Sequence, residues 1–300
     1  MSNLTPLQDG AVVETNSAMY FVAPAGFAHG AVNPFDPTGS FGDGWSGFFI
    51  LDRTDGYGFT GTAGTDLFTY QFSKTEPFLQ EKLADFIRYE NSHSRKVIVS
   101  GPKEMGIPQF IDYALSSTPP PHKIRNSDQR YVVHSTTRAN GESILKEGRL
   151  RSPYDLKQGN RNLDSLRFLS LGEPKDYADH IWFADLGAIG PEVVVASNQM
   201  KAYVADVQYE PGYRFYFDNH KIITAGKDLR VLSGTRVLKQ IDLDGFCVMH
   251  VGTKDLEPQS HWMPSEFTVR ADQFFWSRMR TPEKECNHSH QSVFTNTKKA

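Results

Sequence analysis

The chain has very little cysteine, with only Cys247 and Cys286 among its 300 residues. The first lies in an apolar run and the second in a polar tail, so the sequence provides no disulfide framework. We therefore expect the protein to work in a reducing compartment, the cytoplasm or the nucleus.

Long apolar runs are also missing. None approaches the roughly 18 residues that a membrane-spanning helix requires. The first residues, Met1 to Thr5, lack the cationic start and apolar core of a secretory signal. We expect neither a membrane partner nor secretion by the usual route.

Charge of one sign is not in large excess. The formal net charge is -3 and the pI is about 6.4, so bulk electrostatics give no argument for a nucleic-acid partner, although a local basic patch stays open. The sequence contains no Gly-x-x-x-x-Gly-Lys-Ser/Thr loop and no Gly-x-Gly-x-x-Gly loop. These absences argue against nucleotide hydrolysis of the P-loop type and against a Rossmann dinucleotide unit.

Aromatic residues are abundant, with 21 Phe, 12 Tyr and 4 Trp. Such residues favour strands and bury a large apolar area, so the composition predicts a mixed α+β or mainly β fold. In the first half, apolar patterns predict strands at 18–23, 47–51, 67–72 and 96–100, and helices at 77–91 and 108–114.

A proline run at 119–121 can continue neither a helix nor a central strand. We place a boundary there and predict an α+β domain at 1–122, a second domain at 123–280 and a disordered polar tail at 281–300. In the second domain the pattern predicts strands at 130–134, 180–184, 202–209, 244–251 and 266–269. A helix at 140–148 should end at Gly148.

Three short motifs in the second half carry the functional prediction. The first is His134-Ser135-Thr136 at a strand end, followed by a helix with Ile144 and Gly148. The second is His180-Ile181-Trp182-Phe183-Ala184-Asp185, and the third is Ser265-Glu266-Phe267-Thr268-Val269.

In order and spacing these motifs resemble those of the ADP-ribosyltransferase superfamily, in particular poly(ADP-ribose) polymerases and tRNA 2'-phosphotransferases. The resemblance implies a split β-sandwich with short helices that uses NAD+ as a substrate. It also implies that His134, Ser135 and Thr136 contact the nicotinamide ribose. Ser135 occupies a place usually held by Gly.

The resemblance assigns the remaining roles to the second and third motifs. Trp182, where Tyr or His is usual, would stack on nicotinamide with Phe183 beside it. Glu266 would be the catalytic carboxylate. His134, Trp182 and Glu266 would then transfer ADP-ribose to a protein or nucleic-acid acceptor, because an oxocarbenium-like state needs positioning and a nearby negative charge.

Two alternatives remain open. Residues 212–224 are similar to a segment of the tRNA 2'-phosphotransferases, in which case Arg138 and Arg214 would grip an RNA 2'-phosphate in an NAD+-dependent reaction. The domain would otherwise be a non-catalytic binding module of the same fold, since fold does not fix function.

The first half remains without an assigned role. Tyr20 to Ala23 and Gly44 to Asp52 faintly resemble the first two motifs, which would make residues 1–122 a degenerate copy of the same fold. Cys286, His288 and His290 are metal-binding types in the tail, but a zinc site needs structurally held ligands, so we expect no metal.

Overall fold

The computed structural model describes the chain in segments. They are residues 5–7, 10–15, 18–23, 33, 36, 38–54, 59–63, 67–117, 122–158, 174–202, 204, 206–232 and 235–279. The predicted tail at 281–300 and the proline run lie outside them.

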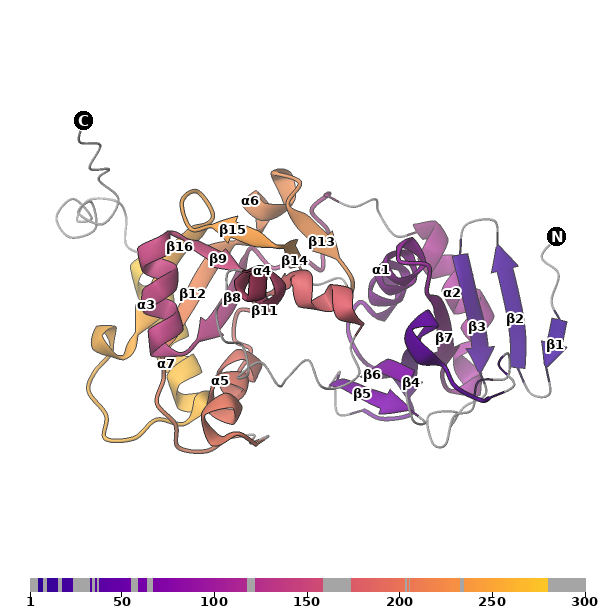
Figure 1. Ribbon diagram of the computed structural model, residues 1–300, viewed down its shortest axis with the longest axis horizontal. Coiled ribbons are helices and arrows are strands. Elements are labelled where there is room, and N and C mark those ends of the chain that lie inside the picture. The colour runs from indigo at the N-terminus through magenta and orange to yellow at the C-terminus, as the bar shows by residue number, and fades with distance from the viewer. Residues whose placement is uncertain are drawn as a thin grey trace.

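The fold is mixed α+β, as predicted, with the two halves of the chain side by side (Figure 1). The first half forms a seven-stranded sheet in the order β1-β2-β3-β7-β4-β6-β5. Its strands are β1 (Thr5–Leu7), β2 (Gly10–Thr15), β3 (Ala18–Ala23), β4 (Trp45–Leu51), β5 (Phe59–Ala63), β6 (Leu67–Ser73) and β7 (Lys96–Ser100). Strands β3, β7, β4 and β6 are parallel, and α1 (Leu79–Ser92) and α2 (Ile107–Ser117) share one hydrophobic core with the sheet.

The second half contains a four-stranded antiparallel sheet in the order β11-β8-β12-β16. Its strands are β8 (Tyr131–Thr136), β11 (Ala184–Asp185), β12 (Tyr213–Asp218) and β16 (Cys247–Gly252). Two smaller sheets accompany it, one made of β10 (His180–Trp182), β14 (Thr235–Leu238) and β13 (Asp228–Arg230), the other of β9 (Arg149–Arg151) and β15 (Gln240–Asp242).

Side chains alternate between the two faces of the four-stranded sheet, because successive residues of a strand point in opposite directions. Val133 and Tyr216 pack against α5 (Gly190–Met200) and α7 (Pro264–Met279) on one face. Val132 and Phe215 face the opposite core, which includes Ile144 of α3 (Arg138–Glu147). The remaining short helices are α4 (Pro153–Gln158) and α6 (Asn219–Thr224).

Helix α3 ends at Gly148 as the sequence predicts, but it begins at Arg138, two residues before the predicted start. Its N-cap, Thr137, accepts a hydrogen bond from the Asn140 amide at 3.4 Å, which satisfies one of the free donors of the first turn. Gly148 ends the helix with a φ of 70°, a left-handed conformation that glycine adopts without strain.

The two halves meet through a buried polar network as well as an apolar core. Tyr177 and Val231 of the second half are buried among the core residues of the first. Arg95 pairs with Glu90 and with Asp176, the latter at 2.8 Å, and Tyr177 donates to Glu90 at 2.5 Å.

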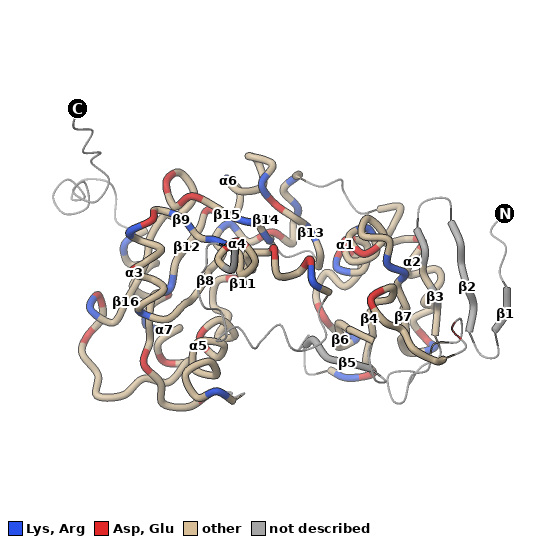
Figure 2. The backbone as a smooth tube through the Cα atoms, viewed as in Figure 1, with Lys and Arg blue, Asp and Glu red and all other residues tan. Residues whose placement is uncertain are grey.

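Charged side chains of both signs are spread over the described parts of both halves (Figure 2). Most of them are exposed to water, but a few are buried in pairs. Arg125, which precedes β8, and Asp85 of α1 form a buried bidentate ion pair at 2.6 and 3.0 Å. This pair adds a second polar link between α1 and the chain that leads into the second half.

Three predictions about the fold were wrong. The two sheets differ in topology, one with parallel inner strands and one antiparallel, which contradicts a degenerate duplication. Residues 266–269 belong to α7 rather than to a strand. In the described part of 202–209 the only ladder contact is a bridge from Tyr209 to Trp262.

Candidate functional site

His134 lies near the end of β8 in a position that fixes its proton. Its Nδ1 is 3.0 Å from the carbonyl oxygen of Trp182. A carbonyl only accepts, so Nδ1 carries the hydrogen and Nε2 is left as an acceptor. Burial lowers the pKa of His134 below its usual range, so the neutral ring persists at pH 7.

Thr136 and Ser135 point to opposite faces of the sheet. Thr136 is two residues from His134 on β8 and therefore shares its face. Ser135 is paired with Arg214 in the sheet and accepts a weak hydrogen bond from Arg214 Nη1 at 3.5 Å. Of the three residues assigned to the ribose, the strand brings His134 and Thr136 together and directs Ser135 away.

One face of the Trp182 indole, the residue that the resemblance assigns to stacking, is already covered by a cation. The guanidinium carbon of Arg236 lies 3.4 Å from the centre of the indole, within cation–π range, and the Tyr177 ring lies 6.1 Å away. The indole packs against the core of the first half. The contribution of Trp182 to the site is its backbone carbonyl, which holds His134.

Phe183 is the aromatic residue beside His134. It lies between β10 and β11, with its ring centre 6.2 Å from the imidazole and 5.0 Å from Phe217. The ring is half-buried. A half-buried aromatic ring next to a neutral acceptor can contact a flat heterocycle while the imidazole binds a hydroxyl group.

Glu266 does not join this site. It is exposed in the first turn of α7, and its Oε2 accepts from the Met263 amide at 3.4 Å, a helix-capping contact. Helix α7 packs on the Val133 face, whereas His134 is on the other face of the same sheet. Among the described residues, no carboxylate forms an ion pair with His134.

The two arginines proposed for an RNA phosphate do not share a pocket. Arg214 has no exposed surface, and its Nε is 2.9 Å from Asp272 on the α7 side of the sheet. Arg138 is exposed at the start of α3 and pairs with Glu210 at 3.2 Å. The structure therefore gives no support to joint phosphate binding by Arg138 and Arg214.

A buried polar cluster surrounds Arg214. The sequence analysis did not predict this cluster. Tyr216 donates to Asp272 at 2.8 Å, and Tyr209 donates to Glu192 at 2.7 Å. Burial raises the pKa of Glu192. The sequence signal was an Arg within the aromatic run Tyr213–Asp218, which is a central strand and therefore needs buried partners for the charge.

Within the described part of the chain, no group of three or more His, Cys, Asp or Glu residues could hold a metal ion. The Cys286, His288 and His290 set lies outside it. None of the helices described is long and apolar enough to cross a membrane.

Comparison with known proteins gives no family model, no curated protein and no solved structure that matches this chain.

Proposed function

We propose that the second half of this chain is a binding module of ADP-ribosyltransferase type and that its ligand is NAD+. The observation that carries the proposal is His134, a neutral imidazole whose Nδ1 donates to Trp182 and whose Nε2 accepts. A ribose hydroxyl of NAD+ would donate to Nε2, and Thr136 would hydrogen-bond the ribose or the carboxamide.

Phe183 takes the stacking role in this proposal, in place of Trp182. The nicotinamide ring of NAD+ carries a positive charge, and an aromatic face attracts a cation. Trp182 already has such a partner in Arg236. In this proposal His134 and Thr136 keep the roles that the resemblance implies, Ser135 does not, and the aromatic contact moves by one residue in the second motif.

Binding is favoured over transfer because of where Glu266 lies. Cleavage of the bond between nicotinamide and ribose develops positive charge, and a nearby carboxylate is the usual means of stabilising it. Glu266 is exposed on α7, on the side of the sheet away from His134. ADP-ribosyl transfer remains the second candidate function, supported by the pairing of His134 with Thr136 on one face.

The test is calorimetric titration with NAD+, run beside an assay for nicotinamide release. We expect binding by the wild type, weakened about tenfold in His134→Ala, which corresponds to one hydrogen bond of about 1.4 kcal/mol. His220→Ala is the matched control, because His220 lies on α6. We expect no nicotinamide release from any of these proteins.

Other outcomes are equally informative. Release that requires His134 but persists in Glu266→Gln would establish transfer with a different carboxylate. If release is lost in Glu266→Gln, the binding-only proposal fails and the transferase assignment of Glu266 is restored. Absence of NAD+ binding at millimolar concentration would overturn both candidate functions.

A further inference from the structure

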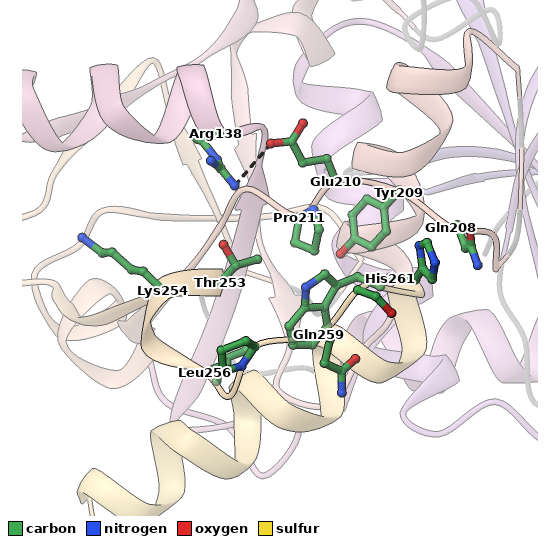
Figure 3. Close-up of a pocket in the computed structure, with 13 residues that line it drawn as sticks. Arg138, Gln208, Tyr209, Glu210, Pro211, Thr253, Lys254, Leu256, Gln259 and His261 are labelled. Carbon is green, nitrogen blue, oxygen red and sulfur yellow. Dashed lines mark ion pairs between the residues drawn. The ribbon is translucent and has the colours of Figure 1, made fainter.

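A pocket of about 650 Å³, lined by polar and apolar side chains, opens where one end of the four-stranded sheet meets the loop that precedes α7. Arg138 of α3, Glu210, Thr253, Gln259 and His261 are among the residues that line it (Figure 3). Its size lies within the range of small-ligand and nucleotide pockets, about 300 to 1,000 Å³. None of these residues is among those proposed to hold NAD+.

The charged residues that line this pocket are Arg138 and Lys254, which are basic, and Glu210, which is acidic. Lys254, in the short helical turn η5 (Thr253–Asp255), makes no ion pair with any described residue, and its side chain extends outward from the turn in Figure 3. Arg138 pairs with Glu210 at 3.2 Å, but both side chains are more than half exposed. Exposed pairs of this kind contribute about 1 kcal/mol or less, so an incoming phosphate can displace Glu210.

The floor of the pocket is aromatic and its wall is held in place. Trp262 and Tyr209 are buried beneath it and joined by a β-bridge. The Gln259 amide oxygen, in the orientation that satisfies its neighbours, accepts from Arg270 Nε at 2.9 Å. Arg270 also lies over the Trp262 ring, with its guanidinium carbon 5.8 Å from the ring centre. The exposed His261 ring offers a face on which a base can stack.

We propose that this pocket binds single-stranded nucleic acid. One base would stack on His261 and hydrogen-bond with Gln208, since amide side chains match the hydrogen-bonding edges of bases and aromatic faces stack on them. Lys254 extends outward from η5, whereas Arg138 points toward Glu210, so the two cations would contact different phosphates of a polymer. The net charge of -3 is no obstacle, because phosphate contacts act locally within about 10 Å.

The experiment measures fluorescence anisotropy of a labelled single strand of about ten nucleotides, as RNA and as DNA, with full-length protein and without NAD+. We expect Arg138→Ala and Lys254→Ala each to weaken binding about fivefold and each to reduce the salt dependence of log K by about one unit. Lys146→Ala is the matched control, because Lys146 is exposed near the other end of α3.

Three results would overturn the proposal. They are no binding at low salt, equal binding by wild type and both variants, or complete displacement by polyglutamate at matched charge, which would indicate a general anion surface. Since NAD+ is omitted, failure here is read separately from failure of the NAD+ proposal.

Discussion

At the scale of single residues, the strongest constraint is the burial of Arg214. Its guanidinium is completely inaccessible to solvent and is neutralised by Asp272, with Glu192 at 3.7 Å. Removing one member of a buried ion pair leaves an unpaired charge in a medium of low polarity. This cluster holds β12, α5 and α7 together and is separate from the His134 face.

Asp272→Asn tests that constraint. We expect it to lower the free energy of unfolding by about 3 to 5 kcal/mol, because Arg214 keeps its charge and loses its main counter-charge. Denaturant titration measures the change, with the exposed Asp244→Asn as control, expected within about 0.5 kcal/mol of wild type. A loss under about 1 kcal/mol would mean that Glu192 alone neutralises Arg214.

At the scale of elements, close packing of α3 on the sheet positions the pocket and the His134 strand together. Gly141 of α3 lies over Tyr213, and a Cβ added there would be 2.2 Å from Tyr213 Cδ2. Gly252 lies on the opposite side of the ring, where an added Cβ would be 3.2 Å from Cε1, so the room for Tyr213 to shift is small. Two glycines thus enclose one aromatic ring.

Gly141→Ala is therefore expected to destabilise the protein, although alanine in a helix is ordinarily better than glycine by about 1 kcal/mol. Overpacking costs about 1 to 3 kcal/mol and here exceeds that gain. Thermal unfolding, compared with Glu142→Ala at the adjacent exposed position, measures the difference. Stabilisation by Gly141→Ala would show that Tyr213 has room to shift.

Elements with long regular patterns could be predicted from sequence, and short ones could not. The helix predicted at 77–91 is α1, and the strand predicted at 67–72 is β6. The predicted strand at 180–184 splits at Phe183 into β10 and β11, which belong to different sheets. The two-residue spacing of apolar side chains cannot reveal such a break, because it continues unchanged from one strand to the next.

The candidate site was predictable only where local sequence decides the geometry. His134 and Thr136 share a face because they are two residues apart on one strand. The stacking of Arg236 on Trp182 depends on a partner 54 residues away, and the placement of Glu266 depends on the packing of α7. Contacts of this range follow from tertiary structure, which a single motif does not contain.

At the scale of the whole molecule, the interface between the two halves contains a histidine that responds to pH. The Tyr89 hydroxyl donates a hydrogen bond to Asp176 at 2.5 Å. His180 Nε2 lies 2.9 Å from the same hydroxyl oxygen and must therefore be the donor in the hydrogen bond between His180 and Tyr89. Burial, together with the charge of Arg236, lowers the pKa of His180 from 6.5 to about 3. The ring is therefore neutral in the folded protein.

Stability should consequently decrease as the pH falls below 6.5, where the unfolded chain takes up a proton that the folded chain does not. For one such group the slope is at most about 1.4 kcal/mol per pH unit. Urea unfolding of wild type and His180→Gln between pH 7 and 5 tests this, with a shallower slope expected in the variant. Exposed His261→Gln is the control, and identical slopes in wild type and His180→Gln would contradict the assignment.

The sharing of Tyr177 and Val231 with the core of the first half has a consequence for synthesis on the ribosome. Phe68 and Phe86 are synthesised long before Tyr177 and Val231. The core of the first sheet is therefore complete only after more than half of the chain that follows Phe86 has been synthesised. During that interval its apolar face is exposed, and nascent chains in that state are natural clients of chaperones. The order of translation, and not only the final contacts, then sets how well this protein is made.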